Sequence, residues 1–160
     1  MPVDYSPLPF LSHVNTYCAP APGRLAPVAR LMLGGAGLGL VVVLAVAACL
    51  TPSPQGLGTH EQLGLPPCTF RLLFGLRCPS CGMTTSWAYA LHGQPRAALA
   101  ANAGGLTLCV VALLLAPYLL ISAARGKWLF ALPNDKVLAI SALAVALITL
   151  ADWVFRIAVR

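Results

Sequence analysis

The sequence predicts an all-α integral membrane protein with three transmembrane helices and a short interfacial helix that follows a cysteine-containing loop. Hydrophobic residues make up 59% of the 160 positions and charged residues only 9%, whereas a soluble domain has roughly 25% charged residues. Three apolar segments reach the length of about 20 residues that a helix needs to cross the bilayer core. These segments lack the polar face that a helix of a soluble bundle presents to water.

The first span is predicted over residues 28–50, and a proline-rich tail precedes it. Residues 1–27 hold six prolines and few large apolar side chains, so we expect them to be disordered because they cannot bury enough surface. Within the span, Gly35 and Gly39 form a small-x-x-x-small pair with Gly34 and Gly37 beside them, which predicts close packing against another span, with a dimer face as the alternative. A small-residue box ending at Cys49 also resembles a bacterial lipoprotein cleavage site. The stretch before Cys49 is long for a signal peptide. We therefore expect Cys49 to be a small apolar residue at the end of the helix, and cleavage there is the alternative.

Residues 51–96 connect the first two spans and form with them a single membrane domain, residues 28–160. Pro and Gly are frequent up to residue 67, which predicts a loop. Residues 83–92 are predicted to form the short helix, since Trp87 and Leu91 lie one turn apart on the same face. Three hydroxyl side chains are expected to cap free amides at its start: Thr84, Thr85 and Ser86. Because this helix is short and mostly apolar, we expect it at the interface or against the spans.

The second and third spans are predicted over residues 97–124 and 137–159. Asn102 lies near the start of the second span, where we expect a helix–helix hydrogen bond, with donation to a loop carbonyl as the alternative. In the third span Asp152 precedes Arg156 by four residues. This is the order in which an acid and a base pair on a helix, so we expect an ion pair near the membrane surface.

The net charge of +6 comes from basic residues that are scattered singly and mostly flank the apolar spans. That placement suits lipid headgroups, and it excludes a nucleic-acid site, which would cluster the basic residues on one face. The basic residues divide evenly between the two predicted sides of the membrane, five on each, and only the short connection from Arg125 to Lys136 is dense in cations. We therefore expect it and the N-terminal tail on the cytoplasmic side, with the cysteine loop outside. Trp128 and Trp153 are expected at the water–lipid boundaries.

Three of the six cysteines carry the chemistry that the sequence offers. Cys78-Pro79-Ser80-Cys81-Gly82 predicts a tight turn that directs two sulfurs to one point, as a metal knuckle or a thiol–disulfide pair requires. Cys68 supplies a third sulfur ten positions upstream, whereas Cys18, Cys49 and Cys109 are scattered.

These cysteines lie in a wider pattern, which has the following members: Cys68, Gly75, Cys78, Pro79, Cys81, Gly82, Thr84, Gly93, Ala98 and Asn102. The pattern resembles an uncharacterised family of small bacterial membrane proteins, a domain of unknown function (DUF), over about residues 68–102. The resemblance implies a multi-pass protein of the bacterial cytoplasmic membrane and brings no known activity. Many family members carry Arg directly after the signature Thr, where this chain has Thr85, so an anion-binding role of that position is not expected here.

A structural zinc site is the first hypothesis for the cysteines. Cys68, Cys78 and Cys81 would supply three thiolates, and the backbone amides of the turn can donate to the paired sulfurs. His60 and His92 are the candidates for a fourth ligand in the same region.

Two alternatives involve oxidation. In a thiol–disulfide enzyme, Cys78 and Cys81 would be catalytic, with the pKa of Cys81 lowered by a helix start and Cys68 as the resolving thiol. No thioredoxin-like strand pattern surrounds the motif. Alternatively, a disulfide from Cys68 to Cys78 or Cys81 staples the loop to the short helix.

The sequence therefore favours a non-enzymatic accessory or interaction protein of the membrane, whose loop at Cys68, Cys78 and Cys81 is ordered by zinc or by a disulfide. Its expected partners are the lipid bilayer and either another membrane protein or a second copy, with no nucleic acid. The alternative is a membrane thiol–disulfide oxidoreductase that uses Cys78 and Cys81.

Overall fold

The computed structural model describes residues 24–130 and 135–158, so most of the predicted tail and Cys18 lie outside the described residues. Every regular element within these ranges is helical. Three long helices, α1 (Pro27–Cys49), α5 (Ala103–Arg125) and α6 (Asp135–Ala158), are long and apolar enough to cross a membrane. Four short helices lie between α1 and α5: η2 (Thr59–Leu63), α2 (Thr69–Phe74), α3 (Met83–Leu91) and α4 (Pro95–Ala101). The all-α fold with three candidate spans is confirmed.

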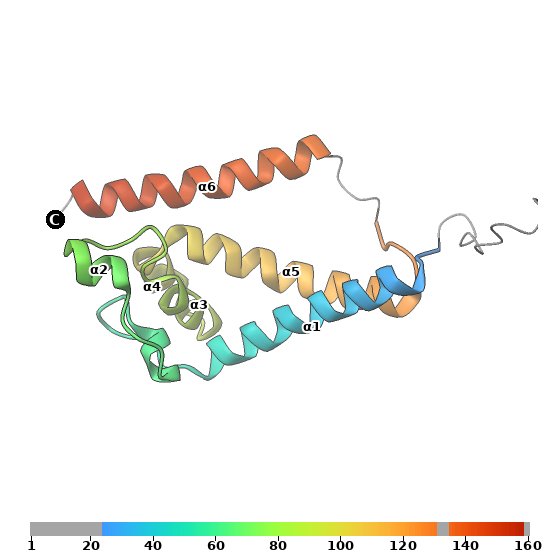
Figure 1. Ribbon diagram of the computed structural model, residues 1–160, viewed down its shortest axis with the longest axis horizontal. Helices are drawn as coiled ribbons and strands as arrows, with labels where there is room; N and C mark the ends of the chain where they lie inside the picture. Colours follow the sequence, from blue (N-terminus) through green and yellow to red (C-terminus); the bar gives the residue numbers. More distant parts are fainter. Residues whose placement is uncertain (1–23, 131–134, 159–160) are drawn as a thin grey trace, which may run out of the picture.

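Helices α1 and α5 run antiparallel, side by side, and form the central pair (Figure 1). The start of α1 and the end of α5 meet where the Leu25 amide donates to the Gly126 carbonyl at 2.8 Å. Arg30 closes the same end, because its Nε donates to the Ala123 carbonyl at 2.9 Å. Further along the pair, a core of Leu44 and small side chains of α5 is covered by the apolar face of α3. The short helix is therefore tucked against the spans, which is one of its two expected positions.

Close packing of α1 is confirmed, but the prediction of which glycines provide it is wrong. A Cβ on Gly35 or Gly39 would meet no atom within 4 Å, whereas one on Gly37 would lie 2.9 Å from Cγ of Leu120 on α5. Two residues turn an α-helix by about 200°, so Gly37 lies on the face opposite to Gly35. The packing face is set by where α5 lies, and the spacing of small residues does not encode that.

The second span begins later than predicted. Residues 97–101 belong to α4, and Asn102 interrupts the helix with extended φ and ψ of −167° and 111°. Its side-chain Oδ1 accepts a hydrogen bond from the Gly105 amide at 2.7 Å, and this satisfies a free donor at the start of α5 as an N-cap does. The predicted span over residues 97–124 is therefore two helices, of which only α5 has the length to cross the bilayer.

Helix α6 lies apart from the central pair along most of its length and contacts α5 near its own C-terminal end (Figure 1). None of its described residues is buried. The contact is close at Gly104 of α5, which lies directly against Thr149 of α6. Large apolar side chains are exposed along all three long helices, and in a membrane protein the acyl chains cover such surfaces.

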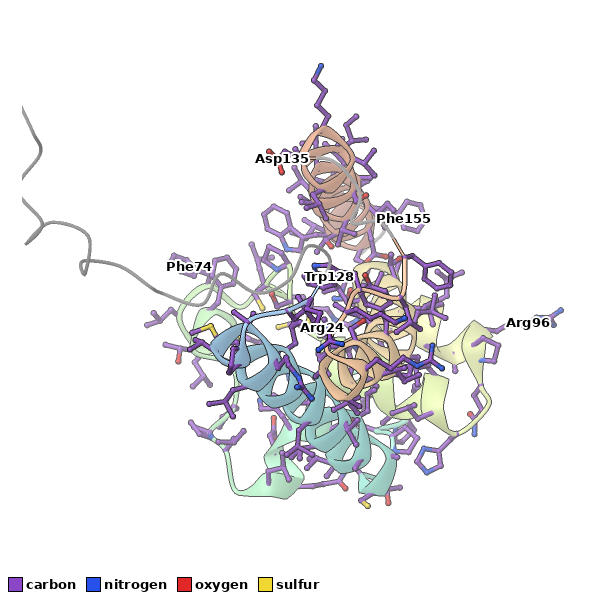
Figure 2. The ribbon with its side chains drawn as sticks, turned by 90° about the vertical axis from the view of Figure 1, so that its right-hand side faces the viewer. Arg24, Phe74, Arg96, Trp128, Asp135 and Phe155 are labelled. Carbon is purple, nitrogen blue, oxygen red and sulfur yellow. The ribbon has the colours of Figure 1, made fainter. Side chains whose placement is uncertain are left out.

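The ends of the bundle differ in content, and both carry cations, since Arg71, Arg77, Arg96 and Arg156 lie at the end of the cysteine turn. The cations expected on one side do lie at the end where α1 and α6 begin and α5 ends: Arg24, Arg30, Arg125, Lys127 and Lys136. Figure 2 views the molecule from this end, with Arg24 and Trp128 labelled there. The cysteine turn lies at the opposite end with α2, α3 and α4 (Figure 1). Which end faces the cytoplasm stays a prediction.

Candidate metal centre

The cysteine turn is confined between α2 and α3 by backbone that closely surrounds it. Helix α2 ends at Gly75, and α3 begins after Gly82, whose φ of +87° lies in the left-handed region. A Cβ on Gly82 would be 2.6 Å from the Gly56 carbonyl oxygen and 2.7 Å from that of Ala101. Only glycine can adopt this backbone conformation in so little space, so the turn after Cys81 requires glycine at position 82.

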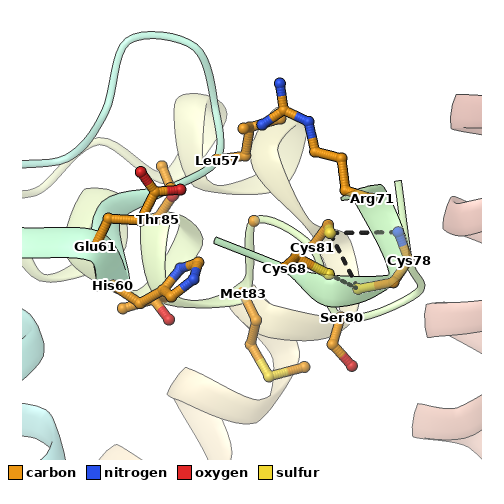
Figure 3. Close-up of a pocket in the computed structure, with 13 residues that line it drawn as sticks. Leu57, His60, Glu61, Cys68, Arg71, Cys78, Ser80, Cys81, Met83 and Thr85 are labelled. Carbon is orange, nitrogen blue, oxygen red and sulfur yellow. Dashed lines mark hydrogen bonds between the residues drawn. The ribbon is translucent and has the colours of Figure 1, made fainter. Parts of the chain in front are cut away.

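The three predicted cysteines converge on one point, as Figure 3 shows. The sulfur of Cys78 lies 3.6 Å from that of Cys68 and 3.0 Å from that of Cys81, and all three lie within 4.8 Å of one another. All three are free thiols, and no sulfur pair is at the bonding distance of about 2.05 Å. The disulfide staple is therefore not formed in this arrangement.

The carbonyls of the turn are held by a buried amide. Asn102, which has no exposed surface, donates from Nδ2 to the carbonyl of Pro79 at 3.0 Å and to that of Cys81 at 3.2 Å. The expected helix–helix hydrogen bond of Asn102 is thus corrected to its alternative, donation to loop carbonyls. Within the turn, the Cys78 amide donates to Cys81 Sγ at 3.3 Å.

Helix α6 reaches the same turn through an ion pair that is largely shielded from solvent. The predicted pair of Asp152 and Arg156 is present at 2.7 Å, with side chains only 15% and 9% exposed. Arg156 also donates to the carbonyls of Cys81 at 3.0 Å and Ala101 at 3.3 Å. Sequence reasoning paired these residues but missed that the guanidinium extends to the cysteine turn. An arginine inside an apolar span was the available signal, because such a charge needs partners in the protein.

Trp153 supplies a second link from α6. Its Nε1 donates to the Arg77 carbonyl at 2.6 Å. A residue expected at the water–lipid boundary therefore also holds the loop segment that leads into Cys78. The turn is thereby held by side chains from the α4–α5 junction and from α6, which are far away in sequence.

The hydroxyl groups at the start of α3 do not cap it, so that prediction is wrong. Helix α3 has no side-chain cap. Thr85 instead pairs with the hydroxyl of Thr59 at 2.8 Å, with both side chains fully buried. Ser86 is within hydrogen-bond distance of the carbonyls of Ala98 and Asn102, at 2.8 and 2.9 Å. These hydroxyls join α3 to η2 and α4, because α3 is surrounded by protein on those sides.

The cysteines line a pocket of about 270 Å³, which we call the cysteine pocket. His60 and Thr84 also line it, but among the described residues the group whose ligand atoms all lie within 4.8 Å contains only the three cysteines. His92 is not part of the pocket lining; its Nδ1 lies 2.7 Å from the Ala88 carbonyl at the far end of α3. Of the two candidates for a fourth ligand, only His60 faces the same pocket.

The pKa values of Cys68 and Cys81 are shifted in opposite directions, and the shift at Cys81 is opposite to the one predicted from the sequence. A hydrogen bond from the backbone of Arg71, in the first turn of α2, lowers the pKa of Cys68 below its usual value. Burial, and then the neighbouring Cys78 thiol, raise the pKa of Cys81 to about 12. The expected lowering of the Cys81 pKa by a helix start is wrong, because Cys81 precedes the N-cap Gly82 and its sulfur is shielded from water.

The remaining pattern residues gather around this site or at helix ends. Ala98 is fully buried beneath Ser86, and Gly93 follows α3 with φ of +72°.

Comparison with known proteins relates part of the chain to a family of unknown function. No curated protein and no solved structure matches the chain. Residues 68–116, which include the three cysteines and Asn102, match the model of a family described as "Protein of unknown function (DUF2752)". Over this segment, the expected resemblance to a domain of unknown function is confirmed.

Proposed function

We propose that Cys68, Cys78 and Cys81 bind one Zn²⁺ ion, which orders the loop end of a multi-pass membrane protein with an accessory or interaction role. The convergence of the three sulfurs within 4.8 Å carries this proposal. Zn–S bonds of about 2.3 Å in a tetrahedral site place sulfurs about 3.8 Å apart. The 3.6 Å between Cys68 and Cys78 is close to that value, and the 3.0 Å between Cys78 and Cys81 has to widen slightly.

The ion supplies a tether that α2 otherwise lacks. No residue of α2 is buried, and among the described elements α2 has no close backbone packing with another helix. Cys68 directly precedes α2, and its sulfur lies beside the turn. Coordination therefore joins a weakly packed helix to a turn that Asn102 and Arg156 already hold, which is a structural use of zinc.

Zinc binding also requires Cys81, a buried thiol with a raised pKa, to lose its proton. The pKa of Cys81 is raised to about 12, so in the absence of metal this thiol keeps its proton at neutral pH. A coordinated Zn²⁺ ion deprotonates thiols and releases protons on binding. A water molecule or His60 would be the fourth ligand; His60 lines the cysteine pocket, but among the described residues it lies outside the group formed by the three sulfurs.

The alternative function is a membrane thiol–disulfide oxidoreductase. The Cys-x-x-Cys spacing and the 3.0 Å between the sulfurs of Cys78 and Cys81 favour it. The attacking species in such chemistry is a thiolate, and the raised pKa of Cys81 disfavours one there. We therefore rank this function second.

The proposed location is the bacterial cytoplasmic membrane, with the cysteine end on the outer side. The density of cations in the short connection from Arg125 to Lys136, at the opposite end, favours this orientation. The bilayer is one partner, and another membrane protein or a second copy is the other.

Metal content tests the function directly. The full-length protein, purified under reducing conditions with zinc supplied, should hold one zinc per chain by native and elemental mass spectrometry. Serine at any of Cys68, Cys78 or Cys81 should remove most of it, because each thiolate completes one site. Cys49→Ser and Cys109→Ser are the matched controls and should keep it. A metal-free parent whose Cys78→Ser variant accumulates mixed disulfides would instead support the oxidoreductase.

A further inference from the structure

An apolar groove of about 370 Å³ adjoins the cysteine pocket on the side of the spans. Its walls are aliphatic side chains from the end of α1, from η2 and from the following loop: Val42, Val43, Val46, Leu50, Leu63 and Leu65. His60, Met83 and Thr84 line both the groove and the cysteine pocket. A ligand of suitable length can therefore contact an apolar wall and a polar pocket at once.

The apolar end of this groove opens towards lipid. Val42 and Val43 are each 53% exposed and Val46 is 39% exposed, on the last two turns of a helix that is long and apolar enough to span the bilayer. The end of a spanning helix lies close to the headgroup region. The groove is thus placed where an acyl chain can enter from the membrane without crossing water.

The polar end offers two opposite charges. Arg71 of α2 and Glu61 of η2 both line the cysteine pocket and are exposed. Figure 3 shows them on two different elements at the rim of the pocket. Among the described residues, no ion pair joins them. Arginine binds phosphate through a planar fork of N–H groups, and a carboxylate attracts an ammonium group.

We propose that the groove and the cysteine pocket bind one zwitterionic glycerophospholipid, such as phosphatidylethanolamine. One acyl chain lies along the valines of α1, the phosphate contacts Arg71, and the ammonium group contacts Glu61. The charge pair selects this headgroup over an anionic one, which would meet repulsion at Glu61. Neither charged residue is among the three thiol ligands, so lipid retention and metal content are measured separately.

Lipid retention by the full-length protein tests the site. The protein is reconstituted in nanodiscs with equal phosphatidylethanolamine and phosphatidylglycerol, then released into detergent and analysed by native mass spectrometry. The parent should retain phosphatidylethanolamine selectively. Val46→Trp should reduce retention about tenfold, as expected from losing contact with about two lipid methylenes. Val111→Trp is the matched control, because Val111 is 44% exposed on α5 and outside the groove, and it should retain the lipid.

Charge variants test the headgroup separately, at exposed positions where folding is not at risk. Glu61→Gln should abolish the preference over phosphatidylglycerol, and Arg71→Gln should weaken retention of both lipids. Equal retention by Val46→Trp and Val111→Trp, or an unchanged preference in Glu61→Gln, would overturn the proposal. Should Val46→Trp fail to fold, Val43→Phe serves in its place. Zinc content is measured in every variant. A parent without zinc contradicts the proposed function, and selective lipid retention by that metal-free parent would still support the lipid site.

Discussion

Replacing Arg156 by Met should destabilise the protein far more than its position near the chain end suggests. In α6 the guanidinium pairs with Asp152 at 2.7 Å and donates to the carbonyls of Cys81 and Ala101. Methionine has a similar apolar stem, so the substitution removes the charge and the donors with little change of packing. The Asp152 carboxylate, 15% exposed, is then left without its cation.

The expected cost follows from this loss. Breaking a buried ion pair by removing one partner costs about 3–5 kcal/mol, because the remaining charge is uncompensated. The Cys81 carbonyl keeps Asn102 as a donor, so it adds little to that figure. A second substitution, Asp152→Leu in the Arg156→Met background, removes the unpaired charge and should recover part of the loss.

Reversible unfolding in mixed micelles, followed by Trp fluorescence, measures the free energy of unfolding of each variant. Arg96→Met is the matched control, since Arg96 points outward from α4 in Figure 2 and is exposed. Such a surface change should stay within about 0.5 kcal/mol of the parent. If Arg156→Met unfolded with the same free energy as Arg96→Met, α6 would not be fastened to the cysteine turn through this ion pair.

Three further outcomes follow from the packing, the thiol acidities and the charges. Gly37→Ala should be about 1–3 kcal/mol less stable than Gly35→Ala in the same unfolding assay, because only the former overpacks the α1–α5 contact; equal stabilities would contradict that contact. In metal-free protein near pH 8, iodoacetamide should label Cys68 before Cys81, as detected by peptide mass spectrometry, and the reverse order would refute the predicted acidities. The free energy of unfolding should fall as pH rises from 9.0 to about 12, because the pKa of Cys81 is raised in the folded state. A topology reporter inserted at Gln62 should lie on the opposite side of the membrane from one at the N-terminus, and the outer side if the cation-dense end is cytoplasmic.

The spans were predictable because hydropathy alone determines which segments enter a bilayer. Residues 28–50 and 137–159 correspond closely to α1 and α6. The break before α5 was missed because alanines flank Asn102 directly, and the glycines that follow, Gly104 and Gly105, were included in the predicted span. Asn102 lies between α4 and α5, and its side chain caps the start of α5. The sequence does not reveal whether a single asparagine in an apolar run hydrogen-bonds to a neighbouring helix, to a loop or to a helix end.

The cysteine site was predictable in its members and not in its surroundings. Spacing alone placed Cys78 and Cys81 in one turn and added Cys68. The acidity of each thiol depends on burial by residues distant in sequence, so the pKa of Cys81 could not be predicted from its position before a helix. The contact of Arg156 with the Cys81 carbonyl likewise depends on how α6 docks.

The X-ray absorption spectrum of the zinc-loaded protein at the zinc edge tests the central claim most directly. Three thiolates from Cys68, Cys78 and Cys81 predict three sulfur scatterers at about 2.3 Å and one lighter atom from water or His60. A spectrum with nitrogen and oxygen neighbours only, or with fewer than three sulfurs, would contradict a zinc site at this turn.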